Sequence, residues 1–558
     1  RKWRVVLWAT LISALTALPA LAGNGKIAGV VQDDSGQALP GANVVVEVGG
    51  EKVGAIADDK GRYFILNIPP GIYAVESSYV GHQKVHQTDI EVRLDLTSTV
   101  DFALKTEAIE GEGVTVVAEA PLVERSLTTS RATIGQAELN NTMPVGDLQD
   151  LINTTPSVFR GYIRGGRKSG VKMLVDGIDV SDTYFRAGEG SQVWNPYTDV
   201  NRSSDGEYAA VGVNASNVQS LDIIAGTFNA EYDAASAGVI NVVTREGGDK
   251  LEGRLFIRSG VGGFKNAGPD VYESLANPEP GDDGTVDKTS YFDLYTQARD
   301  GLLASEDEAD VAKANNYYIF DPNQVTYGDN PSTEVEFSIG GKLPLPRTNF
   351  YLTTRYLNDE GTLPNMLNRS QRHSLKLTHR LNQNLKLTGN VMIDDGGELG
   401  GWVNRNFSGR YSYFPEGALG NKKLGSMVYL GLSHSLSQKT AYDIKISQNK
   451  RQSKFGYSDD NNDGMVQKSE DGDFIFIDSA AESEKYLGVD GSGADADGNF
   501  TFFTTNPGNS RNFDLPFGDN QYRLGQAGFF YEELNRDVTQ LKADITHQYN
   551  YHHQLKAG

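Results

Sequence analysis

The sequence predicts a mostly β protein of three units: an N-terminal β-sandwich, an α+β domain, and the N-terminal part of a transmembrane antiparallel β-barrel. Short strands separated by Gly- and Pro-containing turns fill residues 24–106, and longer alternating strands follow residue 250. No window after the N-terminus holds the roughly 18 uninterrupted apolar residues of a membrane helix. A chain of 558 residues also exceeds one typical domain, so several folding units are expected.

The composition narrows the function classes. A net charge of −22 and a pI near 4.8 argue against nucleic acid as a partner, because phosphate binding needs a basic surface. A mean hydropathy of −0.42 with 62 glycines suits strands that cross a membrane around a polar lumen. Without cysteine, no disulfide contributes to stability. No nucleophile elbow, phosphate-binding loop or zinc-protease motif is present, so we expect no enzyme activity.

The N-terminus predicts export. Three basic residues precede a mostly apolar run over residues 5–18, and Pro19 then leads into Ala20, Leu21 and Ala22. The small-x-small form of that tripeptide is typical of a signal-peptidase site. We therefore expect residues 1–22 to be a signal peptide.

Residues 23–106 form the expected sandwich, because alternating apolar residues are interrupted by turns at short intervals. The turns are Asp34-Ser35-Gly36, Pro40-Gly41, Asp59-Lys60-Gly61 and Pro69-Pro70-Gly71. The order of these motifs resembles the carboxypeptidase regulatory-like domain, and the resemblance implies no peptidase activity.

Residues 121–249 carry three motifs in order: IRGGR at 163–167, LVDGIDV at 174–180, and a long run at 217–248. The pair Asp176-Gly177 suits the positive φ angles of a two-residue hairpin turn. Together the motifs resemble the plug domain of TonB-dependent outer-membrane receptors. The residues that carry the resemblance are Arg164, Gly165, Gly166, Arg167, Asp176 and Gly177. Both arginines are expected either to contact an anionic ligand or to pair with acidic barrel side chains.

The linker at residues 107–120 contains a β-branched run that looks like a TonB box, formed by Val114, Thr115, Val116, Val117 and Ala118. An extended run of this kind can add itself to the sheet edge of a periplasmic partner through main-chain hydrogen bonds. The alternative is a plain strand that completes the sandwich.

After residue 250, apolar and polar residues alternate in long segments, as in Leu385, Leu387 and Val391 with Lys386 and Asn390. Short turns alternate with long loops, a pattern typical of an outer-membrane barrel. Nine strands are expected, near residues 251–259, 333–341, 348–357, 373–381, 384–394, 425–436, 440–449, 537–547 and 551–558. Receptors of this class have about 22 strands, and an unclosed edge cannot face lipid. We therefore interpret the region 250–558 as the first part of a truncated barrel.

One presumed outer loop fits the twelve-residue calcium template, with acidic or amide oxygens at positions 1, 3 and 5, Gly at 6 and Glu at 12. A structural Ca²⁺ site is therefore predicted. The alternative is an acidic, flexible loop. The candidate ligands are Asp459, Asn461, Asp463, Met465, Gln467 and Glu470.

The resemblance implies a receptor of the outer membrane, surrounded by its lipids, with the N-terminal domain in the periplasm. It implies TonB as the partner that drives import of an extracellular ligand, which the sequence leaves open among glycan, peptide and siderophore-like molecules. A surface lipoprotein partner is possible, but the Lys-Asp-Ala-Ser-Ala-Ala run of glycan importers with such a partner is missing. The alternative function is a surface carbohydrate-binding or adhesion protein on the same scaffold, without active transport.

Overall fold

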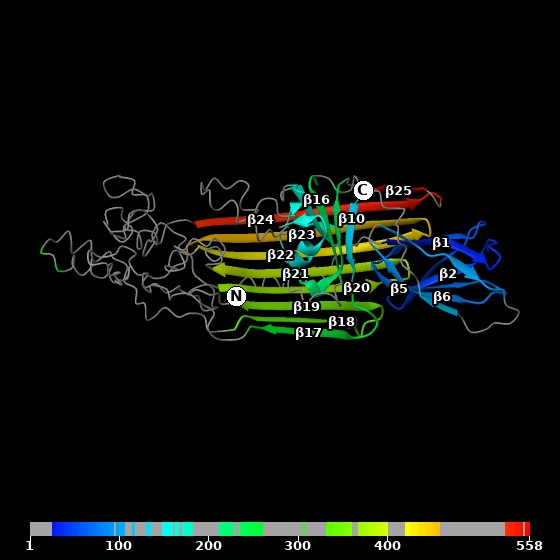
Figure 1. Ribbon diagram of the computed structural model, residues 1–558, viewed down its shortest axis with the longest axis horizontal. Helices are drawn as coiled ribbons and strands as arrows, with labels where there is room; N and C mark the ends of the chain where they lie inside the picture. The colour runs from blue at the N-terminus through cyan, green and yellow to red at the C-terminus, as the bar shows by residue number, and fades with distance from the viewer. Residues whose placement is uncertain are drawn as a thin grey trace, which may run out of the picture.

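The computed structural model contains three units arranged along one axis (Figure 1). A sandwich lies at one end of a long nine-stranded sheet, and a smaller domain lies against one face of that sheet. The structure describes residues 25–93, 96–106, 114–117, 130–135, 148–159, 162–166, 170–181, 211–226, 232, 235–260, 304, 306, 331–359, 367–399, 419–457, 531–550 and 553–558. The expected mostly β fold of three units is confirmed.

The N-terminal sandwich consists of two sheets. The first has the order β4-β1-β7, with β8 also paired to β1, and the second has the order β3-β2-β5-β6-β9. Their inner faces share a core that includes Ile27, Val44, Tyr63 and Phe102. The strands are β1 (Gly25–Asp33), β2 (Asn43–Val48), β3 (Glu51–Ile56), β4 (Arg62–Ile68), β5 (Gly71–Ser78), β6 (Val85–Val92), β7 (Thr97–Thr99), β8 (Phe102–Leu104) and β9 (Val114–Val117).

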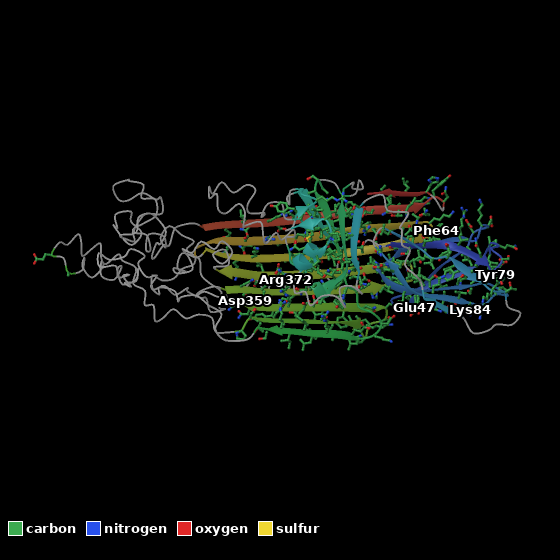
Figure 2. All side chains as sticks on the ribbon, viewed as in Figure 1. Glu47, Phe64, Tyr79, Lys84, Asp359 and Arg372 are labelled. Carbon is green, nitrogen blue, oxygen red and sulfur yellow. The ribbon has the colours of Figure 1, made fainter. Side chains whose placement is uncertain are left out.

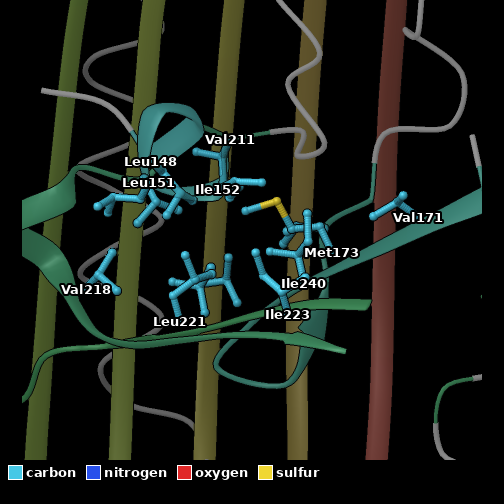
Figure 3. Packing of buried hydrophobic residues seen from close by; sticks show 14 of the residues in the cluster. Leu148, Leu151, Ile152, Val171, Met173, Val211, Val218, Leu221, Ile223 and Ile240 are labelled. Carbon is cyan, nitrogen blue, oxygen red and sulfur yellow. The ribbon is translucent and has the colours of Figure 1, made fainter. Parts of the chain in front are cut away.

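The middle domain is built on a five-stranded sheet of order β10-β15-β16-β13-β14. A short helix covers it, and its Leu148, Leu151 and Ile152 pack onto Leu221 and other apolar side chains of the sheet (Figure 3). The elements are β10 (Ser130–Gly135), α3 (Leu148–Thr154), β11 (Val158–Phe159), β12 (Tyr162–Ile163), β13 (Val171–Val175), β14 (Ile178–Asp179), η2 (Ala215–Asn217), β15 (Val218–Ala225) and β16 (Gly238–Thr244).

Small residues allow the backbone segments of the middle domain to approach closely. A Cβ atom added to Gly166 would lie 2.6 Å from the Cβ of Ala237, and one added to Gly238 would lie 2.5 Å from the side chain of Ile163. Side chains larger than hydrogen therefore do not fit at either glycine without a shift of its neighbour.

The third unit is a single antiparallel sheet in which each strand pairs with the next along the chain. All nine expected strands are present, and several extend beyond the alternating segment that predicted them. The strands are β17 (Glu252–Ser259), β18 (Thr333–Lys342), β19 (Thr348–Asp359), β20 (Leu367–Arg380), β21 (Leu385–Leu399), β22 (Leu419–Ser437), β23 (Thr440–Tyr457), β24 (Tyr531–Gln548) and β25 (Gln554–Ala557).

The two faces of the nine-stranded sheet differ in polarity. Polar side chains such as Glu334, Thr353, Lys376 and Asn390 are buried on the face that contacts the middle domain. Apolar side chains on the opposite face are exposed, among them Leu255, Ile257, Tyr356, Leu377, Ile444, Ile446, Leu541 and Ile545. An apolar outer face and a polar inner face are what a membrane barrel requires. Within the described ranges, no helix is both long and apolar enough to cross a membrane.

The sandwich contacts the end of the nine-stranded sheet where the short turns lie (Figure 1). Figure 2 shows Phe64 on the part of the sandwich nearest the sheet and Tyr79 farther out. Three polar contacts reach three different parts of this rim: Glu51 with Arg347 (2.8 Å), Asn67 with Ser435 (3.0 Å) and Lys26 with Gln548 (3.2 Å). The sandwich is therefore held at the rim by several hairpins of the sheet.

Candidate functional site

Asp176 lies at the tip of the hairpin between β13 and β14. The register pairs Val175 with Ile178, so that Asp176 and Gly177 form the two-residue turn that the sequence predicts. Their φ angles are 50° and 77°, in the left-handed region that such a turn requires at both positions. Asp tolerates this region better than most residues, and the turn carries the carboxylate into the interface with the nine-stranded sheet.

The Asp176 carboxylate collects polar groups from the middle domain and from three strands of the sheet. The Thr244 backbone N–H donates to Oδ1 at 2.9 Å, and its hydroxyl donates to Oδ2 at 2.6 Å. Tyr429 Oη donates to Oδ2 at 2.7 Å, Lys376 Nζ lies 3.4 Å from both oxygens, and Asn390 Nδ2 lies 3.5 Å from Oδ2. A buried carboxylate is stable only when it is paired and hydrogen-bonded in this way.

Electrostatics keep Asp176 ionised. Burial acts to raise the pKa of its carboxyl group, but the charge of Lys376 and the hydrogen bonds from Thr244 and Tyr429 outweigh burial. The pKa therefore lies below its ordinary value of 3.8. Lys445 Nζ also donates to the backbone carbonyl oxygen of Asp176, so both the side chain and the main chain of the turn are held by the sheet.

Glu246 forms a second ionic contact with the same sheet. Its Oε1 lies 3.1 Å from Lys386 Nζ and 3.7 Å from Lys376 Nζ. Burial acts to raise the pKa of the Glu246 carboxyl group, but the charges of Lys386, Lys376 and Arg380 outweigh burial and lower the pKa from 4.5 to about 2. Because Lys376 is near both acids, it links the hairpin turn to the end of the middle domain.

A third set of contacts lies around η2. The Gly212 N–H donates to Asp394 Oδ2 at 2.8 Å, and the same carboxylate accepts from Arg372 Nε at 3.0 Å through its other oxygen. Figure 2 shows Arg372 on the sheet next to the middle domain. The Ser216 N–H donates to Glu336 Oε1 at 3.1 Å. The middle domain is thus attached at several independent points, each of which adds to the cost of moving it.

The structure brings together only part of the predicted motif residues. Gly165 has a φ of 74°, and Arg164 lies on the exposed surface of the same turn. Among the described residues, no acidic side chain forms an ion pair with Arg164, so contact with an anionic ligand stays a prediction. Arg167 and Ala118 lie outside the described residues. So do the signal peptide and every candidate calcium ligand from Asp459 to Glu470.

The strand of the predicted TonB box has an unexpected position. Val114–Val117 forms β9, which pairs in parallel with β6 at the edge of the sandwich. This pairing is the one expected from the alternative interpretation, in which the run is a strand that completes the sandwich. Its assignment as a TonB box stays a prediction, because the same strand can serve both roles.

Sequence reasoning missed most of the partners of Asp176. Alternation places Lys386 and Asn390 on the polar face, but it does not show which polar residue meets which acid. For Lys376 and Tyr429 the sequence contained a usable signal of a polar partner. A lysine or a tyrosine on the inward face of a strand needs such a partner when it is buried. Among the described residues, no group of three or more His, Asp or Glu side chains could hold a metal ion.

Comparison with known proteins accounts for this arrangement of domains. Residues 26–105 match the carboxypeptidase regulatory-like domain, and residues 123–240 match the TonB-dependent receptor plug domain. The chain carries the plug domain of TonB-dependent receptors. The middle domain is the plug domain, and the nine-stranded sheet is part of a β-barrel. TonB-dependent receptors form an outer-membrane family of receptors and transporters, not an enzyme family.

Three relatives give the extent of the similarity. The TonB-dependent transporter Oar of Myxococcus xanthus is 26% identical over 260 residues, covering 42% of this chain and 22% of that protein. The siderophore receptor PirA of Acinetobacter baumannii is 15% identical, with 62% of this chain and 43% of that chain covered and a TM-score of 0.38. A mutant of the ferric enterobactin receptor PfeA of Pseudomonas aeruginosa is 13% identical, with 77% and 48% covered and a TM-score of 0.41. The chain spans less than half the length of each of these proteins.

Proposed function

We propose that this protein is a TonB-dependent outer-membrane transporter that binds an extracellular ligand and imports it with energy transmitted by TonB. The observation that carries the proposal is the position of the plug domain. The domain that matches the plug family is bonded to the polar face of a sheet whose other face is apolar and exposed. Adhesion without transport needs no domain of this kind inside the barrel, so it is not favoured.

Import requires that the plug move or rearrange, because it is bonded to the inner face of the sheet at several points. The contacts at Asp176, Glu246 and Asp394 must then break or change partners. Each is an ionic hydrogen bond, which is stronger than a neutral one. Force applied through the linker that precedes the plug supplies the work, and Val114–Ala118 is the segment on which TonB would pull.

The coupling role of Val114–Ala118 is tested by deleting these five residues from the full-length receptor. Ligand should still bind at the cell surface while uptake is lost, because the strand supplies the attachment for TonB and no part of the outer pocket. Deletion of residues 107–111 is the matched control and should leave uptake in place. Protease resistance of the sandwich in both variants shows whether loss of β9 has unfolded it. Uptake that persists without residues 114–118 would exclude them as the TonB box.

Residues 1–22 direct export, and the sandwich lies in the periplasm, which its contacts at the short-turn end of the barrel sheet support. Outer-membrane lipids contact the apolar outer face. The ligand is a glycan, a peptide or a siderophore-like molecule, a surface lipoprotein is an optional partner, and Ca²⁺ at Asp459–Glu470 orders an outer loop.

A further inference from the structure

Strand β9 forms one edge of the second sandwich sheet. β9 pairs in parallel with β6 through the partners Val85 with Val114, His86 with Thr115, Gln87 with Val116 and Thr88 with Val117. In the sheet order β3-β2-β5-β6-β9, β9 is the last strand, so among the described residues nothing pairs with its outer edge. An edge of this kind presents unpaired N–H and C=O groups that can accept another strand.

A strand has two hydrogen-bonding edges, and β6 occupies only one of them. A partner that recognises residues 114–117 by strand addition can therefore bind the outer edge while the inner edge stays paired with β6. Strand β9 is already extended and paired in this position. Ordering a free backbone costs roughly 1–2 kcal/mol per residue, and a strand held in place by β6 avoids part of that cost when it binds.

The geometry points to a composite docking edge: we infer that TonB adds a strand to the outer edge of β9 while β9 stays on β6, so that the sandwich is part of the TonB-binding surface. The inference rests on the proposed function of residues 114–118 as the TonB box. Acidic residues flank the strand at Glu110, Glu112 and Glu119. The segment of TonB that fits this edge is therefore an extended strand with basic side chains near its ends.

Such an edge changes the route of the applied force. A pull on β9 passes through the β6–β9 pairing into the sandwich, which is fastened to the barrel rim through Arg347 and Gln548. The sandwich also touches the plug, since a Cβ atom on Gly135 of β10 would lie 2.7 Å from Oε1 of Glu91 of β6. Strand β6 thus lies between the docked box and the first plug strand, and movement of the sandwich reaches both the barrel rim and the plug.

A reversible crosslink between β6 and β9 tests the inference in the full-length receptor. Residues 1–558 contain no cysteine, so His86→Cys with Thr115→Cys introduces the only two thiols in this part of the receptor. The two positions are register partners, at a spacing that a disulfide spans. The measurement is the affinity for a soluble periplasmic fragment of TonB, under oxidising and then reducing conditions. Glu47→Cys with Lys52→Cys, an exposed register pair of β2 and β3, is the matched control.

We expect the oxidised receptor to bind the TonB fragment within about threefold of the reduced receptor, because the crosslink leaves the outer edge of β9 free. Binding that is lost on oxidation and restored on reduction overturns the inference, since it shows that β9 must leave β6, while the TonB box itself stands. Absence of binding in both states, with the control also inactive, removes the box assignment and the inference with it.

A second variant tests whether the sandwich contributes to TonB binding. Deletion of residues 25–106 keeps the signal peptide, the box and the plug, but removes the strand on which β9 is ordered. We expect TonB binding to weaken by about tenfold, because the box then pays its own ordering cost. An unchanged affinity in this deletion would show that the sandwich is no part of the docking surface.

Discussion

Lys376 Nζ lies 3.4 Å from both carboxylate oxygens of Asp176, although the two residues are 200 positions apart in the chain. The lysine belongs to a barrel strand and the aspartate to a plug hairpin, and both side chains are buried, with 2% and 1% of their surface exposed. Lys376 Nζ also donates to the backbone carbonyl oxygen of Thr244 at 3.0 Å. One ammonium group therefore ties two plug strands to the barrel sheet.

The first prediction concerns this ion pair. Replacing Lys376 with Met should destabilise the plug in the barrel by about 3–5 kcal/mol, because the substitution leaves a buried carboxylate without its charge partner. Hydrogen exchange of the Thr244 amide measures the effect, since that N–H donates to Asp176 and is released when the contact opens.

Two controls accompany this measurement. Lys439→Met, in an exposed turn of the same sheet, should leave exchange of the Thr244 amide unchanged. The double variant Lys376→Met with Asp176→Asn should be less damaging than the single change, because both charges are then absent. A single variant with wild-type exchange would show that the ion pair does not hold the plug.

The second prediction concerns the turn itself. Gly177→Ala should destabilise the plug by roughly 1–2 kcal/mol or more, because an L-residue is strained at a φ of 77° and the new Cβ would lie 2.9 Å from Lys445 Nζ. Gly165→Ala, at a φ of 74° with nothing within 4 Å of its Cβ, should lose only the stability that corresponds to the backbone strain. Urea unfolding of the plug should rank Gly177→Ala as the more harmful change. The reverse order would count against close packing of Lys445 on the turn.

The third prediction is a pH dependence that comes from Glu246. Its pKa in the folded protein is lowered from 4.5 to about 2, so the unfolded state binds a proton first as the pH falls. The stabilisation by ionised Glu246 is therefore complete above about pH 4.5 and is lost between pH 4.5 and about 2. Protease sensitivity of the plug should rise across this window. Glu246→Gln should be less stable at neutral pH and should show a smaller change in the window, and an identical acid profile would argue against the assignment.

The fourth prediction is calcium binding by the loop at Asp459–Glu470. Isothermal titration of the full-length receptor should show a site with a dissociation constant of about 10⁻⁴ to 10⁻³ M, as in extracellular modules. Glu470→Ala should remove it, because a bidentate carboxylate supplies two of the oxygens around the ion. Asp495→Ala, in a nearby acidic stretch that lacks a Glu in register, is the control and should keep the site. Equal heats for wild type and Glu470→Ala would refute the site.

The sequence by itself determined the elements that depend on local pattern. Period-two alternation identified all nine barrel strands, because a strand between lipid and a polar lumen must alternate wherever it crosses. The Asp176-Gly177 turn was predictable for a similar reason, since few residue pairs accept two positive φ angles in succession. Both signals are contained in a few adjacent residues and need no knowledge of the partner.

Only the tertiary structure decided which distant residues meet. Alternation placed Lys386 and Asn390 on the polar face, but their height relative to Glu246 and Asp176 depends on how the plug sits against the sheet. The pairing of β9 with β6 was likewise not predictable from local sequence, because a β-branched run predicts a strand without specifying its neighbour. Contacts across 200 residues depend on the register and packing of whole domains, and no short window of sequence contains that information.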